Sequence, residues 1–365
     1  MTDLNCQTET IGTHERPEYA LRRRFCTLKE NRSGEAWSNL LHAHWPGWRD
    51  WYLARGATTA ASESESTRAL RRYMPEMIGL IDRLSNNLPD DPVLREFLTF
   101  WCPPRYLVSC TQAVSSDHLG PFLMRNYDLD PELNEMTLLR SNWRGKTVMG
   151  MVEGLSGLSD GMNEDGLAVS LSFGGRIVSG RGFGIPLLIR YVLETCIDVQ
   201  DAVEALRTIP CHMSYNVTLT DRHGAHATVF LSPDRPAMVR PTPWATNHQL
   251  GVEWPRHGRM SATLERAQCL TRLYSDGNPH ENALRTVFLN PPFYSANFRV
   301  GYGTVFTALY RPSSRSVQLV WKDGQSHRWQ MNKFETTSIE IEYTDAGSAV
   351  LSHQSQELSK SRMKT

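Results

Sequence analysis

The strongest constraint on the fold of this chain is a series of short β-type runs that begins after Pro104. Turn residues, such as those at 221–224 and 311–316, separate neighbouring runs. The runs span 106–114, 122–128, 146–153, 166–175, 214–221, 225–232, 236–241, 303–312 and 316–324. Short connections of this kind join strands into hairpins, so the pattern predicts antiparallel sheets.

Helical patterns fill the first hundred residues. The stretches 34–56, 66–88 and 90–101 carry Trp and Leu residues at helical spacing. This spacing predicts a helical N-terminal segment.

Two further helical stretches lie among the predicted strands. In 184–210, Asp198 can cap the second of two helices. The stretch 259–276 places four apolar residues along one predicted inward face, namely Leu264, Ala267, Leu270 and Leu273. Because helices and strands come in blocks, we expect an α+β fold with helices layered on antiparallel sheet. The polar, aperiodic residues 347–365 predict a flexible tail.

Composition excludes several classes of function. The 365 residues contain 39 Lys plus Arg and 39 Asp plus Glu, a balance that argues against nucleic-acid binding. No apolar run approaches the ~18 residues of a membrane span, and we find no secretory leader. The seven cysteines are odd in number, lack a regular spacing and form no CxxC pair, so neither a disulfide framework nor a zinc site is expected. We expect a soluble, cytoplasmic protein with free thiols and leave a homo-oligomer open.

Cys110 is the most informative of these thiols. A cysteine in an apolar strand is ordinarily a small buried hydrophobic residue. Here, however, the predicted strand turns polar at the cysteine, and the next predicted strand delivers Arg125, Asn126 and Asp128. Buried strands avoid such groups unless they are needed. The pattern indicates a reactive site at a strand end.

A catalytic thiol at this position needs a base. A thiol with a pKa of ~8.5 is only a few per cent ionised at neutral pH. A free α-amine, with a pKa of ~7.7 to 8.0, can exchange a proton with it at a cost of about 1 kcal/mol, whereas a lysine at ~10.4 is already protonated. An internal residue has no α-amine. If Cys110 uses its own, the Ser109-Cys110 peptide bond must first be cut.

Six separated blocks resemble one known family. In order they are "SCTQAV", "RNYDLDP", "GMNEDGLAVSLSFGG", "FGIPLLIRYVLETC", "SYNVTLTDRHG" and "ATNHQ". They resemble N-terminal nucleophile (Ntn) hydrolases that act on linear amides, above all the acyl-coenzyme A:6-aminopenicillanic acid acyltransferase family, with penicillin V acylases and bile-salt hydrolases as more distant relatives. The resemblance covers residues 101–324.

The resemblance implies a fold and a processing event. The expected fold is a four-layer αββα sandwich with two antiparallel sheets, preceded by a helical segment. Members of the family cleave themselves before the nucleophile. Residues 1–109 would then be a helical pro-segment or first subunit, 110–346 the catalytic domain and 347–365 the tail.

The resemblance also implies roles for the residues near the thiol. Cys110 would be the nucleophile and, through its α-amine, the base. Arg125 would favour the thiolate and hold substrate, and Asp128 would orient the amine. Residues 125 and 128 face opposite sides of a regular strand, so a bulge or strand end near Tyr127 is required if both enter one pocket.

Three further positions are implied for oxyanion or substrate binding. Asn247 would hold the tetrahedral oxyanion, Ser172 or Phe173 would supply a second donor, and Arg266 would come from a following helix. The substrate would be a small acyl amide or acyl thioester. This chemistry needs no metal and no cofactor.

Three alternatives remain open at this point. A papain-like Cys/His hydrolase is suggested by His248, which lies 138 residues after Cys110, although the local signature of that class is absent. The glycine-rich 180–186 invites a phosphate site, but it fits no phosphate-binding pattern, and a loop is favoured. An uncleaved, non-catalytic binding or scaffold protein is the third, because Ser109 stands where the best-known acyltransferase has Gly.

Overall fold

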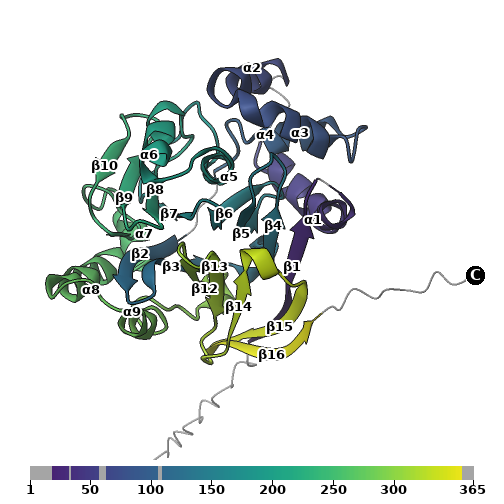
Figure 1. Cartoon of the computed structure of the whole chain (residues 1–365). Coiled ribbons are helices and arrows are strands. Elements are labelled where there is room, and N and C mark those ends of the chain that lie inside the picture. The colour runs from purple at the N-terminus through teal and green to yellow at the C-terminus, as the bar shows by residue number, and fades with distance from the viewer. Residues whose placement is uncertain (1–18, 33, 57–62, 106–108, 356–365) are drawn as a thin grey trace, which may run out of the picture.

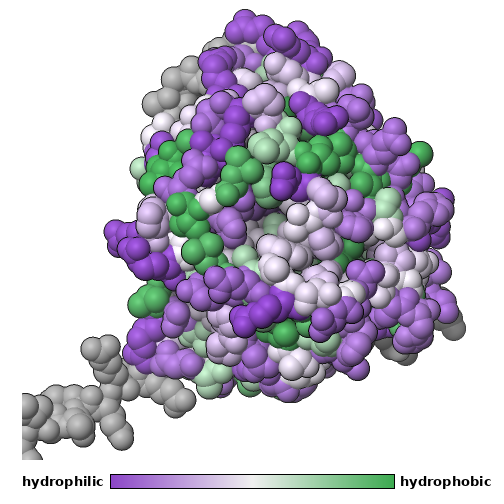
Figure 2. Space-filling view, turned by 90° about the vertical axis from the view of Figure 1, so that its left-hand side faces the viewer, coloured by the Kyte–Doolittle hydropathy of each residue, from purple (hydrophilic) through white to green (hydrophobic). Residues whose placement is uncertain are grey.

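Two β-sheets stacked face to face form the centre of the molecule (Figure 1). The computed structural model describes residues 19–32, 34–56, 63–105 and 109–355. No described helix is both long enough and apolar enough to cross a membrane. On the face shown in Figure 2, hydrophobic side chains lie in small groups among hydrophilic ones.

The larger sheet has ten strands among the described residues. In spatial order they are β10 (Met238–Arg240), β9 (His226–Leu231), β8 (Tyr215–Asp221), β7 (Leu167–Phe173), β6 (Gly157–Asn163), β5 (Val148–Glu153), β4 (Thr137–Ser141), β1 (Ala20–Glu30), β15 (Thr337–Thr344) and β16 (Gly347–Ser355). The pairings are antiparallel except that of β1 with β4, which is parallel.

The smaller sheet has six described strands, all paired antiparallel. Their order is β11 (Trp244–Ala245), β2 (Ser109–Asp117), β3 (Gly120–Leu129), β12 (Gly303–Arg311), β13 (Ser316–Val320) and β14 (Ser326–Gln330). Strands β2 and β3 pack against β7 and β8 of the larger sheet. The predicted strand 106–114 is described only from Ser109 onwards, and Tyr106, Leu107 and Val108 lie outside the described residues.

Helices cover the outer face of each sheet. On the larger sheet, α5 (Ile185–Thr195) and α6 (Val199–Thr208) pack on β5 to β9. Outside the smaller sheet lie α7 (Pro255–Met260), α8 (Thr263–Ser275) and α9 (Glu281–Phe288), and Leu270 and Leu284 of the last two join Ala113 and Met124 in a second core. The predicted α+β, four-layer αββα arrangement is confirmed.

Two glycines let α5 approach the sheet closely. A Cβ at Gly157 would lie 2.4 Å from Pro186, and one at Gly161 would lie 2.9 Å from Leu193. Asp160 directly precedes Gly161 in β6, and its carboxylate faces the smaller sheet, where it accepts a hydrogen bond from Arg125.

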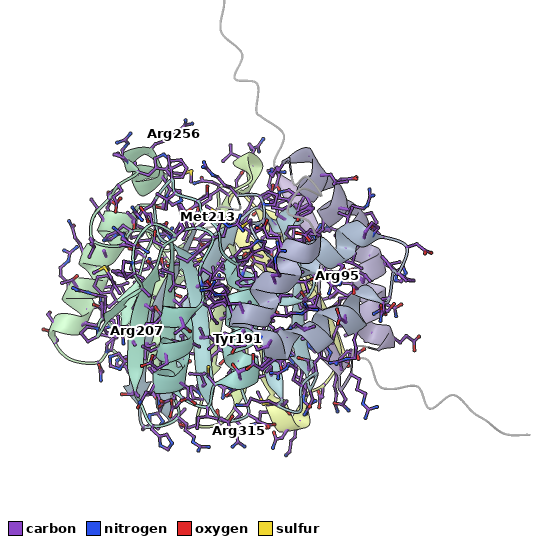
Figure 3. The ribbon with its side chains drawn as sticks, turned by 90° about the horizontal axis from the view of Figure 1, so that it is seen from above. Arg95, Tyr191, Arg207, Met213, Arg256 and Arg315 are labelled. Carbon is purple, nitrogen blue, oxygen red and sulfur yellow. The ribbon has the colours of Figure 1, made fainter. Side chains whose placement is uncertain are left out.

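The N-terminal helices form a block beside the larger sheet. They are α1 (Glu35–Ala54), α2 (Glu63–Tyr73), α3 (Ile78–Ser85) and α4 (Pro92–Thr99). Short 3₁₀ turns occur at Pro75–Met77, Pro131–Leu133, Phe298–Val300 and Met331–Lys333. The view from above in Figure 3 shows the N-terminal helices, with Arg95, on one side of the strands and α7, with Arg256, on the other.

The expectation that the segment before Cys110 is wholly helical is wrong. Ala20–Glu30 forms β1, which lies between β4 and β15. Within β1, Phe25 and Thr27 are fully buried, whereas the preceding arginines reach solvent, so the strand alternation is hidden by charge. The segment before Cys110 therefore contributes β1 to the larger sheet as well as the four helices.

Two smaller expectations also need correction. The first nine residues of the predicted flexible tail, Gly347–Ser355, form β16, which pairs with β15. Leu264 is 49% exposed, because the buried side of α8 runs through Thr263, Arg266, Ala267 and Leu270. On α8, Arg266 is therefore buried and Leu264 is exposed.

Replacing Phe25 with Ala is expected to lower the free energy of unfolding by about 3 to 5 kcal/mol. The Phe25 ring is fully buried and lies between Trp321 and Trp329, with centroid distances of 6.2 and 5.8 Å. Urea unfolding of a Cys110→Ala chain measures the change. Arg24→Ala is the control, since that side chain is 67% exposed, and it should cost about 0.5 kcal/mol or less. Similar losses for both variants would show that β1 is not part of the core.

Candidate active site

Cys110 lies at the start of β2 with its side chain fully buried between the two sheets. The Arg125 guanidinium donates a hydrogen bond through Nη2 to Cys110 Sγ, at 3.3 Å. Strand β3 brings Arg125 to this face because it pairs with β2 in regular register, with Gln112 opposite Arg125 and Cys110 opposite Tyr127. The thiol and the guanidinium predicted from the sequence are therefore in contact.

Arg125 is itself held by the larger sheet. Its Nη1 donates to Asp160 Oδ2 at 2.9 Å and to Ser159 Oγ at 3.0 Å, and its guanidinium carbon lies 4.1 Å from the centroid of the Tyr127 ring. Arg125 and Asp160 are both fully buried. Burial alone would lower the pKa of Arg125, but the nearby Cys110 and Asp160 raise that pKa above its ordinary value. The guanidinium stays charged beside the sulfur.

The Cys110 thiol is protonated at neutral pH in the uncut chain. Burial, with a smaller contribution from the charge of Asp128, raises the pKa of Cys110 to about 12 against the opposing effect of Arg125. A protonated thiol is a much weaker nucleophile than a thiolate, and Arg125 alone does not ionise it. Efficient attack on a substrate would need a base.

Asn247 contacts the backbone nitrogen of Cys110. Strand β11 pairs with β2 through Ala245 and Gln112, which brings Asn247 level with Cys110. Asn247 Oδ1 accepts a hydrogen bond from the Cys110 N–H at 3.3 Å, and Asn247 Nδ2 donates to the Phe173 carbonyl at 3.2 Å. In the uncut chain the amide thus holds the nitrogen of the Ser109-Cys110 bond.

Asp128 and Arg266 lie on the other face of the smaller sheet. Arg266 Nη1 donates to Asp128 Oδ2 at 2.8 Å and to Thr111 Oγ1 at 3.1 Å, and Thr304 Oγ1 donates to Asp128 Oδ1 at 2.7 Å. Both partners of the Arg266–Asp128 ion pair are almost completely buried. Arg266 is therefore an interior residue of α8 and not a surface arginine.

The β-bulge that would turn Arg125 and Asp128 to one side is absent from β3. The β2–β3 ladder is unbroken from Ser109 opposite Asp128 onwards, and the irregularity lies in β12, between Thr304 and Phe306. Strand β3 ends at Leu129, however, one residue beyond Asp128, which pairs with Ser109. The Ser109-Cys110 bond therefore lies beside the end of β3, where groups from both faces can reach it.

Ser172 and Phe173 are near the site but are engaged elsewhere in the uncut chain. Ser172 Oγ donates to the Thr246 carbonyl at 3.1 Å and accepts from Gln112 Nε2 at 3.4 Å. Phe173 offers its carbonyl to Asn247. Phe173 therefore contacts Asn247 directly, and Ser172 contacts the residue before it. Neither side chain has a hydrogen bond to Cys110 among the described contacts.

Sequence analysis missed several residues of the site. Asp160 and Ser159 occur in a glycine-rich stretch that resembles a turn, although it forms the buried strand β6. Tyr127 donates a hydrogen bond from its hydroxyl to the Glu153 carboxylate at the end of β5. An acidic residue ending an apolar run was the available signal for Glu153. For His257, in α7, the sequence gives no comparable signal.

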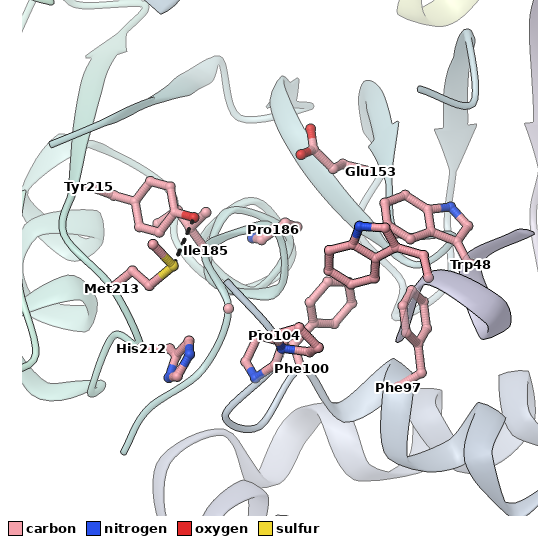
Figure 4. A pocket seen from close by; sticks show the side chains of 14 residues that line it. Trp48, Phe97, Phe100, Pro104, Glu153, Ile185, Pro186, His212, Met213 and Tyr215 are labelled. Atoms are coloured by element: carbon pink, nitrogen blue, oxygen red, sulfur yellow. Dashed lines mark hydrogen bonds between the residues drawn. The ribbon is translucent and has the colours of Figure 1, made fainter. Parts of the chain in front are cut away.

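An apolar pocket adjoins the site (Figure 4). Aromatic residues of the N-terminal segment line one side of it: Trp48, Trp51, Phe97 and Phe100. The remaining lining includes Glu153, Ile185, Met213 and Tyr215. The Tyr215 hydroxyl contacts the Met213 sulfur at 4.0 Å. Burial raises the pKa of Tyr215 well above its ordinary value. Glu153 accepts a hydrogen bond from Tyr127, and this links the pocket to the strand pair that carries Cys110.

No described group of three or more His, Cys, Asp and Glu residues has the arrangement of a metal site. The polar groups around Cys110 are instead paired with one another. Their chemistry is that of a buried thiol with a fixed cation on one side and a held peptide nitrogen on the other.

Comparison with known proteins adds a family and a set of structural relatives. The family model for acyl-coenzyme A:6-aminopenicillanic acid acyl-transferase matches residues 115–326, more than half of the chain. Arg125, Asp128, Asn247 and Arg266 lie inside the match, and Cys110 lies five residues before it. A search of curated proteins found no match.

Solved structures resemble this chain at low sequence identity. A mutant of conjugated bile acid hydrolase from Clostridium perfringens has 12% identity and a TM-score of 0.43, covering 68% of this chain and 96% of its own. Penicillin V acylase from Agrobacterium tumefaciens has 15% identity and a TM-score of 0.40, covering 63% and 90%. An N-acylethanolamine-hydrolyzing acid amidase orthologue from Caenorhabditis elegans has 18% identity and a TM-score of 0.40, covering 56% and 93%.

Replacing Asp160 with Asn is expected to destabilise the fold by about 3 to 5 kcal/mol, because it leaves the buried Arg125 without its carboxylate. Denaturant unfolding in a Cys110→Ala background measures this. Glu340→Gln is the control: its pair with Arg24 is exposed and 3.5 Å long, so it should cost about 1 kcal/mol at most. A loss at Asp160 no greater than that at Glu340 would contradict the central place of this ion pair.

Proposed function

Because the chain belongs to the acyl-coenzyme A:6-aminopenicillanic acid acyl-transferase family, we propose that it is a self-processing cysteine amidase or acyltransferase. It cuts its own Ser109-Cys110 bond and then acts on the C–N bond of small linear amides. The observation that carries this proposal is the double hold on Cys110, whose sulfur accepts from Arg125 and whose peptide nitrogen donates to Asn247.

Scission changes the chemistry of the thiol. In the uncut chain Cys110 has only an amide nitrogen, and burial keeps the thiol protonated. Once the bond is cut, that nitrogen becomes an α-amine attached to the same residue. An amine with a pKa of ~7.7 to 8.0 can take the thiol proton, and Arg125 beside the sulfur favours the thiolate that results. The contact with Asn247 would keep the new amine in place.

Turnover then follows a thioester route. The Cys110 thiolate attacks the carbonyl carbon of the substrate, and the amine product leaves with the proton held by the α-amine. Water or another amine takes the acyl group from the sulfur, so hydrolysis and transfer share the same intermediate. Asn247 Nδ2 is a donor for the oxyanion if it turns from the Phe173 carbonyl, and Ser172 or Phe173 would supply a second donor.

Asp128 and Arg266 support the amine from the opposite face. Their ion pair lies on the α8 side of the sheet, next to Thr111 and level with Ser109. A carboxylate there can accept from a freed α-amine at the strand end. Arg266 would then orient Asp128 in the cut enzyme and not contact the substrate.

The apolar pocket is suited to the acyl group. Its wall is dominated by aromatic rings, and Glu153 in its lining accepts a hydrogen bond from Tyr127, which pairs with Cys110 across β2 and β3. Flat or extended apolar groups bind such walls through burial and ring contacts. We therefore assign an acyl amide or acyl thioester with an apolar acyl part as substrate, while the amine part is not specified by this pocket.

The N-terminal segment would remain with the enzyme after scission. Strand β1 is an inner strand of the larger sheet, and Trp48, Trp51, Phe97 and Phe100 line the pocket. A segment that forms both core and binding wall is a subunit and not a discarded leader.

The alternatives receive less support from the geometry. His248 Nδ1 lies 2.9 Å from Thr263 Oγ1 and 3.2 Å from Thr246 Oγ1, so this nitrogen is engaged with two hydroxyls and not with Cys110. A papain-like pair with Cys110 would need this nitrogen or its neighbour at the sulfur. In an uncleaved scaffold protein the Arg125–Asp160 pair would serve only the stacking of the sheets, and the intact mass of the purified protein decides that question.

Wild-type protein is expected to run as two fragments that meet at Ser109/Cys110, and Cys110→Ala is expected to abolish both scission and turnover. Intact-mass measurement and an assay with N-acyl amines check this. Two controls accompany it: Cys211→Ala, another buried thiol, and His248→Ala should each keep most of the activity. Turnover by Cys110→Ala would remove this residue from the mechanism, and loss of activity in His248→Ala alone would favour a Cys/His pair.

Replacing Trp51 with Ala is expected to raise KM for substrates with an aromatic or long apolar acyl group by about tenfold, because the variant loses a ring contact in the pocket. The value of kcat should change little, since the thiol is untouched. The comparison is a series of N-acyl amides of increasing acyl size. Leu53→Ala, on the exposed side of the same helix, should leave KM unchanged. An unchanged KM in Trp51→Ala would place the acyl group elsewhere.

A further inference from the structure

A buried histidine, His257, lies against Ser109, whose peptide bond to Cys110 is the proposed scission site. His257 belongs to α7, and its Nε2 is 3.3 Å from Ser109 Oγ, within hydrogen-bond distance. Ser109 is the first described residue of β2 and immediately precedes Cys110. None of the steps described so far uses His257.

The surroundings hold the imidazole in one place. His257 is 3% exposed and stacks on Trp254 with a centroid distance of 5.2 Å and an interplanar angle of 25°. The edge of its ring meets Phe173 at 5.0 Å and 79°. Its Nδ1 has no hydrogen-bond partner among the described residues, so Ser109 is the polar contact of this ring. Because Trp254 and Phe173 hold the ring, its hydrogen bond restrains the Ser109 side chain.

The ring is neutral around physiological pH. Burial, together with the charge of Arg266, lowers the pKa of His257 to about 4. A neutral imidazole can hydrogen-bond to a hydroxyl without adding a cation beside Arg266. The nearby phenol of Tyr302 is also uncharged, because burial and Asp128 raise the pKa of Tyr302 to about 12.

We propose that His257 is a positioning residue for self-scission: through the Ser109 hydroxyl it holds the Ser109 carbonyl carbon in front of Cys110 Sγ. This inference rests on the proposed function. Arg125 restrains the sulfur from the side of the larger sheet, Asn247 restrains the peptide nitrogen at the sheet edge, and His257 restrains the acyl side from the helical side.

The scission step is balanced with these groups in place. Cys110 Sγ forms a bond to the Ser109 carbonyl carbon, the C–N bond breaks, and the thiol proton ends on the Cys110 nitrogen. Water then adds to the thioester and gives a carboxylate on Ser109 and a free thiol on Cys110. A nucleophile and carbonyl that are already aligned react faster, because the entropy of alignment is lost before the step. His257 contributes to that alignment without touching the reacting atoms.

The test follows the scission of newly made full-length chains, by intact mass over time after cell-free synthesis. His257→Phe keeps the aromatic packing and removes the hydrogen bond, and we expect scission about tenfold slower. His257→Gln places an amide where Nε2 lies and should restore most of the rate. Ser109→Ala should slow scission to a similar extent, and the double variant Ser109→Ala with His257→Phe should be no slower than either single variant.

Several results would overturn this inference. They are wild-type rates in His257→Phe or Ser109→Ala, equal slowing by Gln and Phe at position 257, and multiplied effects in the double variant. Turnover per cut molecule should be unchanged in His257→Phe once scission is complete, and a matching loss there would indicate a general structural defect. If His257→Phe does not fold, Ser109→Ala and His257→Gln decide the question. A wild-type chain that never cuts would refute the proposed function itself.

Discussion

A buried ion pair between the two sheets determines much of this structure. Arg125 of the smaller sheet meets Asp160 of the larger one, and neither side chain reaches solvent. Removing either charge alone would leave the other uncompensated in an apolar interior, so the pair constrains how the sheets stack. The same guanidinium contacts Cys110 Sγ. The fold and the reactive centre therefore depend on one interaction, which also explains why a cation can remain charged beside a buried sulfur.

The Ser109-Cys110 bond, where we propose scission, lies where three restraints of different kinds meet. A charge holds the sulfur, an amide oxygen holds the nitrogen, and a neutral ring contacts the hydroxyl of the preceding residue. They come from elements far apart in sequence: β3, the residue after β11, and α7. Such an arrangement is possible because the bond lies beside the end of β3, where side chains from both faces of the sheet are within reach.

Sequence reasoning predicted the layers and the residues on the nucleophile strand pair. Period-two alternation on β3 already separates Arg125 from Asp128, and the structure keeps them on opposite faces. Strand β1 was missed because three arginines precede Phe25 and hide its alternation. Asp160 was missed because its role depends on Arg125, a partner on the other sheet, and a local sequence pattern carries no information about such a contact. The inward turn of Arg266, in place of Leu264, likewise follows from its ion pair with Asp128.

The central place of β1 has a consequence for a cut molecule. Once the chain is divided before Cys110, the piece that contains β1 is a separate polypeptide whose strand still lies between β4 and β15. Two polypeptides that share one sheet unfold by dissociating, so the melting temperature of the cut protein should depend on its concentration. The uncut chain has no such dependence, because its pieces are held at a fixed local concentration by the peptide bond. Cutting would thus change unfolding from a unimolecular to a bimolecular equilibrium, with the contacts of the fold preserved.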